Sequence, residues 1–263
     1  MKAFFVALLA ICCATLLVIG NIHWDKKTTV AGQTEAIKID NKEYEEVESA
    51  AASINPKELL VFANNWPEKS KEQFRKALEE ERPFHILIVG SESMGVEKNG
   101  WHNLVRAAVK ETYGETVTIE TLEYEMNSHQ FVQENKQKDL IEQKADMIII
   151  EPFTYKDNGK VRIEDSLANL TRIRNDVKNE NQNVEFVIQP PHPLFNARYY
   201  PIQVEELKEY SEKRGITYLD HWTAWPDWHT EEIKDYLLED SSGPSEKGHE
   251  AWAEYLEKFL VSK

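Results

Sequence analysis

The chain has 263 residues, of which 41% are hydrophobic, and this is enough to build the core of one sizeable domain. Its 46 acidic side chains outnumber 31 basic ones, which gives a formal net charge of −15. Because an acidic surface repels phosphate backbones, the composition argues against nucleic acid as a partner. Both cysteines, Cys12 and Cys13, lie near the start, so we expect neither a disulfide nor a cysteine-based zinc site in the folded part.

The first 20 residues contain an apolar, uncharged run from residue 3 to residue 20. Its length lies between that of a signal-peptide core and that of a membrane span. We favour an uncleaved, single-pass anchor in the cell membrane over residues 1–20, with the rest of the protein outside. If the segment is cleaved instead, the protein is secreted. Residues 21–55 are polar and lack an apolar period, and we interpret them as a stalk or lead-in.

Residues 56–83 are expected to form a helical lead-in to the main domain. After Pro67, the apolar residues Phe74 and Leu78 are four positions apart, which places them on one face of a helix. Pro83 then ends the helical pattern.

From residue 84 to residue 263, apolar runs of strand length alternate with longer amphipathic stretches. The runs cover residues 84–90, 116–124, 145–153, 184–191 and 216–220. Helix-like segments lie near residues 100–112, 129–143, 164–180, 202–214 and 246–260. Continuous runs rich in Ile and Val favour a parallel sheet that is covered on both faces. We therefore predict an α/β fold: a three-layer α/β/α sandwich with a five-stranded parallel, flavodoxin-like doubly wound sheet.

Polar, aromatic and histidine residues gather directly after the predicted strands. The segments that follow them read GSESMG, EYEMNSH, EPFTYKDNG, QPPHPLFNARYYP and DHWTAWPDWH. A further polar segment, DSSGPSEKGHEAW, leads into the last helix-like stretch. Open parallel sheets bind their ligands at the carboxyl ends of the strands, so we expect the functional site at this edge.

The order of these pieces resembles the SGNH/GDSL hydrolase superfamily over residues 84–263. The resemblance rests on the Gly-Ser turn after the first run, the polar loop after the third, and the NARYYP…YSEKRGITYLD run. Above all it rests on the late segment in which Asp240 precedes GPSEKGHEAWAEYL. It implies a serine ester hydrolase with a nucleophile after the first strand, an oxyanion hole of a Gly N–H and an Asn side chain, and a late Asp-His pair.

The stretch GSESMG is where the resemblance implies the nucleophile. An alignment on Gly95 places Ser91 there, an alignment on Gly90 places Glu92 there, and Ser93 needs an insertion. We favour Ser91. The alternative is that these serines only cap the helix that follows.

The oxyanion hole matches the superfamily pattern less well. Asn127 and Ser128 stand where a glycine is expected, although their backbone N–H groups can still serve. Lys156 occupies the expected asparagine and offers a positive charge instead. We assign the asparagine to Asn158, two positions later, and the alternative is a plain Asp-Asn-Gly turn.

The catalytic base is the largest departure from the pattern. Asp240 matches the family aspartate, but Gly243 replaces the expected catalytic histidine, and glycine cannot take a proton. A serine hydroxyl is a weak nucleophile without an adjacent base. We favour His249 as the substitute, although a histidine at a helix start is often only packed. His192 and His221 are further candidates at the same predicted edge.

Two further groups of residues occur in these segments, one of potential metal ligands and one of aromatic side chains. Asp220, His221 and His229 lack the tight spacing of a metal site, so we predict no metal, and we expect no cofactor. Several aromatic residues are expected to be core and rim packing, or else a stacking platform for sugar rings. They are Tyr199, Tyr200, Trp222, Trp225 and Trp228.

The sequence thus supports two hypotheses. The first is an esterase or acylhydrolase outside the membrane that acts on a small acyl ester, for example an O-acyl group of a cell-surface glycan. Its catalytic residues would be Ser91, Asn158, Asp240 and His249. The second is a catalytically degenerate protein of the same fold that binds glycan or a protein partner, which the replacement at position 243 favours.

Overall fold

The computed structural model describes residues 56–95 and 100–262. The predicted anchor over residues 1–20 and the stalk over residues 21–55 lie outside the described residues. Within the part of the chain that the structure describes, no helix combines the length and apolar character needed to cross a membrane.

The sheet has the predicted topology. Five parallel strands lie in the order β2-β1-β3-β4-β5, which is the flavodoxin-like arrangement. The strands are β1 (Phe84–Ser91), β2 (Val117–Tyr124), β3 (Met147–Ile150), β4 (Glu185–Ile188) and β5 (Thr217–Tyr218). The α/β prediction and the parallel, doubly wound sheet are therefore confirmed.

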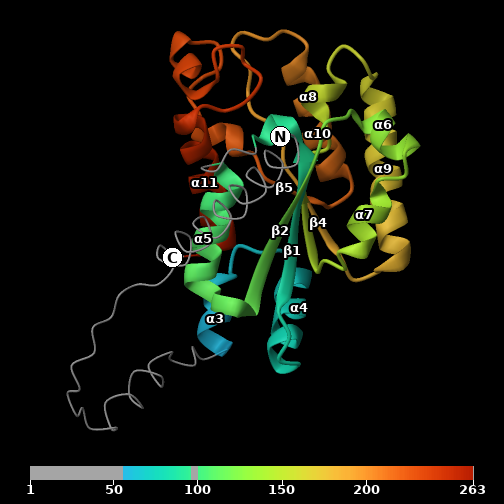
Figure 1. Cartoon of the computed structure of the whole chain (residues 1–263), viewed down its shortest axis with the longest axis vertical. Coiled ribbons are helices and arrows are strands. Elements are labelled where there is room, and N and C mark those ends of the chain that lie inside the picture. The colour runs from blue at the N-terminus through green and yellow to red at the C-terminus, as the bar shows by residue number, and fades with distance from the viewer. Residues whose placement is uncertain (1–55, 96–99, 263) are drawn as a thin grey trace, which may run out of the picture. The chain divides into compact units, whose positions relative to one another are not determined.

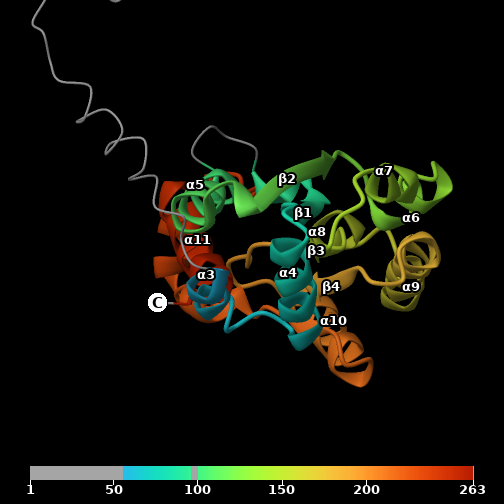
Figure 2. The same ribbon diagram turned by 90° about the horizontal axis from the view of Figure 1, so that it is seen from below.

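Helices cover both faces of the sheet, as Figures 1 and 2 show. On one face lie α3 (Pro56–Phe62), α4 (Glu68–Glu79), α5 (Trp101–Tyr113) and α11 (Glu246–Leu260). On the other lie α6 (Ser128–Gln133), α7 (Gln137–Glu142), α9 (Ile163–Glu180) and α10 (Tyr200–Lys213). The short helix α8 (Thr154–Asp157) follows β3, and short 3₁₀ turns include η1 (Glu92–Met94), η2 (Gly114–Thr116), η3 (His221–Ala224) and η4 (Glu231–Tyr236).

Alternation along β1 explains the two hydrophobic layers. Ile86 and Ile88 pack into the cluster under α5 and α11, whereas Leu87 and Val89 pack into the cluster under α6, α7 and α9. Successive side chains of a strand point to opposite faces, so a continuous apolar run is what a sheet buried on both sides requires.

One predicted helix proved to be two. The stretch 129–143 divides into α6 and α7, because the chain turns at Asn135, whose φ of 57° lies in the left-handed region. Asparagine tolerates this conformation better than most residues, and a helix cannot continue through it.

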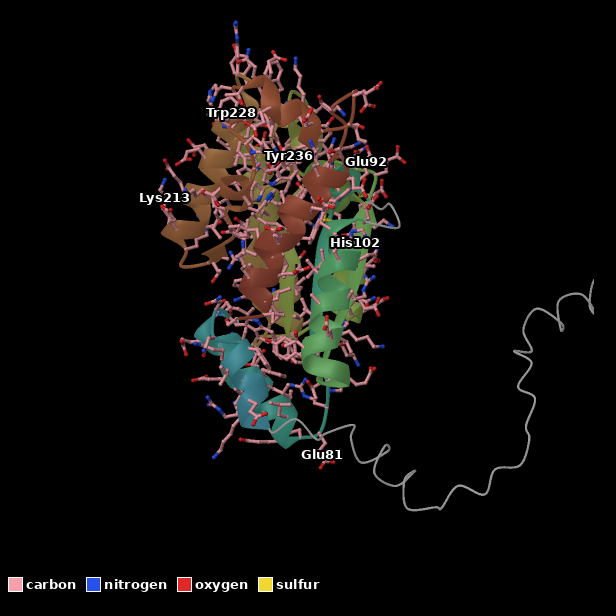
Figure 3. The ribbon with its side chains drawn as sticks, turned by 90° about the vertical axis from the view of Figure 1, so that its left-hand side faces the viewer. Glu81, Glu92, His102, Lys213, Trp228 and Tyr236 are labelled. Atoms are coloured by element: carbon pink, nitrogen blue, oxygen red, sulfur yellow. The ribbon has the colours of Figure 1, made fainter. Side chains whose placement is uncertain are left out.

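The helices before β1 pack onto the amino end of the sheet. The helix predicted after Pro67 is confirmed as α4, and Phe74 on its inner face is fully buried. Trp66 lies against both Phe74 and Phe84, and its indole N–H donates to the Leu260 carbonyl at 2.9 Å. Figure 3 shows Glu81, which precedes β1, and Glu92, which follows it, far apart at the two ends of that strand.

Candidate active site

The carboxyl end of β1 is built around a buried hydroxyl–carboxylate pair. Ser91 is fully buried, and its Oγ donates a hydrogen bond of 2.7 Å to Oε2 of Glu151. The Ser91 backbone N–H donates to the same oxygen at 2.9 Å. Glu151 follows directly after β3, the neighbouring strand, so parallel pairing alone brings these two residues to one edge.

Local backbone geometry completes the surroundings of Glu151. The chain turns sharply at Phe153, where φ is 66°, and this turn lets the Thr154 N–H donate to Glu151 Oε1 at 3.0 Å. Gly90 permits the close approach of the two strands, because a Cβ there would lie 2.9 Å from the Glu151 Cβ and 2.6 Å from the Met94 sulfur. A side chain at position 90 would therefore disrupt the pair.

The pKa of the Glu151 carboxyl is raised, chiefly by burial. The bonds from Ser91 and Thr154 act in the opposite direction, since they stabilise the charged form. A carboxylate with a raised pKa is a better proton acceptor than an exposed one, so Glu151 has the chemistry of a general base toward Ser91.

Ser93 extends this arrangement by one hydroxyl. Its Oγ lies 2.7 Å from the Ser91 Oγ, and Ser93 is also fully buried. Because the Ser91 proton is directed to Glu151, the Ser93 hydroxyl is the donor in the Ser–Ser pair. Ser91 also begins η1 as its N-cap, so the capping alternative and the hydroxyl pair coexist.

The loop around Asp240 and Gly243 is bonded within itself, and Asp240 is exposed whereas Gly243 is buried. Asp240 Oδ1 accepts two bonds from Ser242, from its N–H at 3.0 Å and its hydroxyl at 2.7 Å. These bonds lower the pKa of Asp240. Leu238 N–H donates to the Gly243 carbonyl at 2.9 Å, which closes the loop. The Asp240 carboxylate is thus oriented by a serine rather than by a histidine.

His249, the substitute base predicted from the sequence, packs at the start of α11. It is almost fully buried, and its Nδ1 accepts the backbone N–H of Trp101 at 3.2 Å. Its ring lies against Gly95, where a Cβ would come within 2.7 Å of the ring carbon Cε1. These contacts do not join His249 to the Ser91 hydroxyl, whose partners are Glu151 and Ser93.

The two other histidine candidates are buried below the same edge. His221 Nε2 donates to the Pro190 carbonyl at 2.8 Å, and its Nδ1 accepts the Trp225 indole N–H at 3.1 Å. Burial lowers the pKa of His221 to about 3. Both nitrogens of this neutral ring are therefore satisfied, so His221 acts as a core residue. The His192 ring contacts two backbone carbonyl oxygens, that of Ser93 at 3.1 Å and that of Ser241 at 3.2 Å.

Lys156 and Glu92 lie in contact at the carboxyl edge of the sheet. The Lys156 ammonium forms an ion pair with the Glu92 carboxylate, and both side chains are partly buried. Lys156 occupies the position of the expected oxyanion asparagine, and Glu92 is the residue that the alignment on Gly90 places at the nucleophile. Glu123, at the end of β2, faces the same region, and burial and then the charge of Glu92 raise its pKa to about 7.

The remaining predicted oxyanion groups have other partners. The Ser128 N–H donates to the buried Asp157 carboxylate at 2.8 Å, and the Asn127 N–H donates to Gln130 at 3.0 Å within a capping box. Asn158 lies in a turn that ends at Gly159, whose φ is 73°. The Asp-Asn-Gly turn is therefore present, and Lys156 rather than Asn158 reaches toward the residue next to Ser91.

The sequence reasoning missed Glu151. A signal for it exists, because a charged residue directly follows the wholly apolar strand Met147–Ile150. A buried carboxylate at the carboxyl end of a strand costs free energy unless hydrogen-bond donors lie near it.

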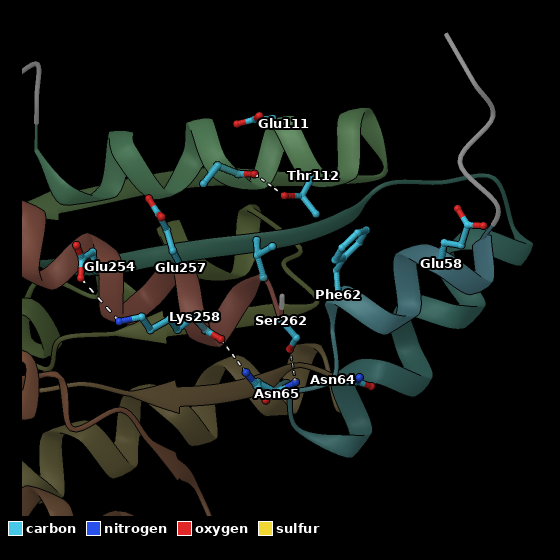
Figure 4. Close-up of a pocket in the computed structure, with 12 residues that line it drawn as sticks. Glu58, Phe62, Asn64, Asn65, Glu111, Thr112, Glu254, Glu257, Lys258 and Ser262 are labelled. Atoms are coloured by element: carbon cyan, nitrogen blue, oxygen red, sulfur yellow. Dashed lines mark hydrogen bonds and ion pairs between the residues drawn. The ribbon is translucent and has the colours of Figure 1, made fainter. Parts of the chain in front are cut away.

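A large groove lies elsewhere. It has a volume of about 970 Å³ and runs between α3, α5 and α11, toward the end of the sheet where α3 and α4 pack (Figure 4). Its walls are acidic, and the visible ion pair joins Lys258 to Glu254 at 3.7 Å. The residues that line this groove include no pair like Ser91 and Glu151, so the groove is not the candidate active site. Within residues 56–95 and 100–262, no group of three or more His, Cys, Asp or Glu residues is arranged to hold a metal ion.

Comparisons with known proteins bear on the fold of the chain. No family model and no curated protein matches the sequence. Among solved structures, a protein from Parabacteroides merdae assigned as a GDSL-like lipase has a TM-score of 0.56 at 13% identity, covering 67% of this chain and 94% of its own. An acetylxylan esterase from Geobacillus stearothermophilus, studied as a catalytic mutant, has a TM-score of 0.53 at 15% identity, covering 67% and 93%.

A GDSL-like lipase from Bacteroides thetaiotaomicron has a TM-score of 0.51 at 10% identity, and the match covers 73% of this chain and 98% of the lipase. The chain therefore has the SGNH/GDSL hydrolase fold, and the resemblance seen in the sequence is confirmed at that level. Identities this low describe the fold and not the reaction.

Proposed function

We propose that this domain is an ester hydrolase of the SGNH fold in which Ser91 is the nucleophile and Glu151 is its base. The observation that carries the proposal is the 2.7 Å bond from the Ser91 hydroxyl to the buried Glu151 carboxylate. A hydroxyl at the carboxyl end of the first strand is where the superfamily resemblance implies the nucleophile, and an adjacent base is what it needs.

The proposed reaction has two acyl-transfer steps. The Ser91 oxygen attacks the acyl carbon while its proton passes to Glu151, and the tetrahedral intermediate then expels the alcohol, which takes that proton. Water attacks the resulting acyl-serine in the same way and releases the carboxylic acid. Lys156 is the cation that we assign to the developing oxyanion, a role that requires it to exchange its Glu92 partner for the substrate.

The substrate class that we propose is an O-acyl group on a cell-surface glycan, cleaved outside the membrane by a domain held on residues 1–20. Three observations support this part. The apolar run at the start suits an anchor, one structure of the same fold is an acetylxylan esterase, and aromatic residues follow β4 and β5, although Tyr200 and Trp225 among them are buried. Among these aromatics, Tyr199 is 76% exposed and available for stacking on a sugar ring.

A second function, binding of glycan or a protein partner without hydrolysis, is favoured by two specific features. Gly243 occupies the place of the catalytic histidine, and the Lys156–Glu92 ion pair occupies the place of the oxyanion asparagine and the aligned nucleophile. Both features remove parts of the usual serine mechanism, and neither affects the ability to bind.

Hydrolysis of a chromogenic acetyl ester by the full chain separates the two functions. We expect Ser91→Ala to lower the rate about 10³-fold or more, and Glu151→Gln to lower it by a similar factor. Ser70→Ala is the matched control, because Ser70 is an equally buried serine on α4 whose hydroxyl contacts only the Met147 sulfur among the described residues. Equal rates for all four proteins would exclude the Ser91 mechanism and leave binding.

A further inference from the structure

The reaction proposed above leaves one buried hydroxyl of the candidate site without a role, that of Ser93. Its Oγ lies 2.7 Å from the Ser91 Oγ, and both serines are fully buried. The Ser91 hydroxyl in turn donates to Oε2 of Glu151, also at 2.7 Å. Ser93 donates to Ser91 and Ser91 donates to the carboxylate, so the three side chains form a continuous chain of hydrogen bonds. A proton can therefore pass from Ser93 to Glu151 through the Ser91 hydroxyl.

The two serine oxygens differ in the lone pairs that remain for a reaction. A hydroxyl oxygen has two lone pairs that accept hydrogen bonds. The Ser91 Oγ accepts the Ser93 hydroxyl and, at 3.4 Å, the Ser93 backbone N–H, so both of its lone pairs have donors. Among the described residues, the Ser93 Oγ has no other hydrogen-bond partner than Ser91. Ser93 thus keeps both lone pairs for an acyl carbon, whereas Ser91 has to give up its long bond from the Ser93 N–H before it attacks.

The turn η1 fixes the position of the Ser93 hydroxyl. Ser91 is the N-cap of this turn, and the Ser93 carbonyl oxygen lies 3.1 Å from Nδ1 of His192. Glu92, between the two serines, forms its ion pair with Lys156 and bonds to neither hydroxyl. The same cation therefore lies beside the turn that carries both serines. A nucleophile that is held in place before the substrate binds loses little entropy when it reacts.

We propose that Ser93 is a second nucleophile of this site and that Ser91 relays its proton to Glu151. The Ser93 oxygen attacks the acyl carbon of the ester, its proton passes to the Ser91 Oγ, and the Ser91 proton passes to Glu151. The tetrahedral intermediate expels the alcohol, which takes the proton from Glu151, and an acyl-Ser93 ester remains. Water attacks this ester, its proton follows the same route, and Ser93 regains a proton as the carboxylic acid leaves. The inference rests on the proposed function, because it uses the same base and the same class of substrate.

The rate of ester hydrolysis in Ser91→Ala does not distinguish the two nucleophiles. The substitution removes the attacking oxygen in one case and the relay in the other, and both predict a large loss. A probe that stays bound to the serine that attacks it does distinguish them.

The test is the reaction of the full chain with an alkyl fluorophosphonate, which loses fluoride and forms a phosphonate ester on an activated serine. Fragmentation of the labelled peptide by mass spectrometry then separates Ser91 from Ser93, because Glu92 lies between them. We expect label on Ser93 in the unaltered chain. Ser70 is the internal control and should stay unlabelled, since it is equally buried and contacts only the Met147 sulfur among the described residues.

Two variants test the relay. Ser91→Ala leaves the Ser93 proton without a route to the base, so we expect the labelling of Ser93 to slow about 10²-fold or more. Glu151→Gln removes the proton acceptor and should slow the labelling by a similar factor. Ser70→Ala should label at the rate of the unaltered chain.

Label on Ser91 alone would overturn the second nucleophile and leave the proposed function intact. Labelling of Ser93 that is equally fast in Ser91→Ala would overturn the relay. Equal labelling of Ser70 and Ser93 would also overturn the proposal, because it would show that the probe reacts with the unfolded chain. No label on either Ser91 or Ser93 would remove the serine mechanism itself, and this inference with it.

Discussion

The two halves of the candidate site differ in burial and in bonding. At the end of β1, Ser91 is fully buried and is bonded to the equally buried Glu151. In loop 238–243, Asp240 is exposed and is bonded only to its neighbour Ser242 among the described residues. The first half therefore holds a hydroxyl and a proton acceptor in one desolvated cluster, whereas the second half holds a carboxylate with nothing to orient.

The half that resembles the superfamily pattern most closely is therefore not the half that holds a proton acceptor. The segment after Asp240 resembles the SGNH/GDSL pattern most closely in its spacing, yet Gly243 removes its proton acceptor. The segment after β1 departs from the superfamily pattern in its residue types. It nevertheless has a proton acceptor, Glu151, which follows the neighbouring strand β3. A spacing can persist because it suits the packing of the final helix, so it indicates the fold more strongly than it indicates the mechanism.

The largest effect that we expect comes from removing the carboxylate of the buried half. Glu151→Ala leaves three buried donors without an acceptor, two from Ser91 and one from Thr154. We expect a loss of about 3–5 kcal/mol in the free energy of unfolding, measured by urea denaturation. Glu151→Gln keeps the shape and should lose clearly less. A loss below about 1 kcal/mol for the alanine variant would break the comparison, because the cluster would then not be tightly bonded.

A pH-dependent effect should follow from His221, beneath the edge. Burial lowers its pKa from 6.5 to about 3, so between these values the unfolded chain binds a proton that the folded chain does not. Its contribution is fully present above pH 6.5 and is lost as the pH falls, at about 1.4 kcal/mol per unit. The unaltered chain should therefore lose about 3 kcal/mol more than His221→Gln between pH 7 and pH 4.

Comparing those two proteins removes the opposing effect of carboxyl groups with raised pKa, such as Glu123 and Glu151, because both proteins contain them. Urea denaturation at the two pH values provides the measurement. Parallel losses in both proteins would show that His221 is not held neutral by burial.

A smaller effect should come from the ion pair between Lys156 and Glu92. The two side chains are 18% and 38% exposed, so solvent screens part of their attraction. A double-mutant cycle with Lys156→Met and Glu92→Gln should give a coupling energy of about 1 kcal/mol or less. Because the assigned oxyanion role needs a free Lys156, Glu92→Gln should also raise the rate of ester hydrolysis, and an unchanged rate would argue against that role.

The smallest effect on stability should come from Gly243, which is buried in the loop after Asp240 but has room beside it. A Cβ on Gly243 would meet only the Leu238 Cδ1, at 3.6 Å, which is an ordinary contact. Gly243→His should therefore change the free energy of unfolding by less than about 1 kcal/mol. If the comparison is right, adding this imidazole near Asp240 alters ester hydrolysis much less than Glu151→Gln does. A large gain in rate would show instead that the half with Asp240 still functions.

Regular features of the fold followed from local patterns. The continuous apolar runs predicted parallel strands, and the structure confirms all five, with β3, β4 and β5 clearly shorter than their runs. The segment 129–143 was wrong as a single helix, because its apolar period continues across the turn at Asn135. The candidate residues Ser91, Asn158, Asp240 and His249 all lie at or near the predicted edge. The side chains of Ser91, Asp240 and His249 hydrogen-bond to partners other than the expected ones, and Asn158 lies in a turn.

By itself, the sequence determined the layered α/β fold and the edge at which polar side chains gather, because burial on both faces of a sheet requires particular residues at a particular period. Only the tertiary structure decided which of these side chains meet. The Ser91–Glu151 bond and the Lys156–Glu92 pair join residues that are 60 and 64 positions apart, and His192 lies 99 positions from Ser93. No local period carries such information, because these contacts depend on how adjacent strands end and on how much water they exclude.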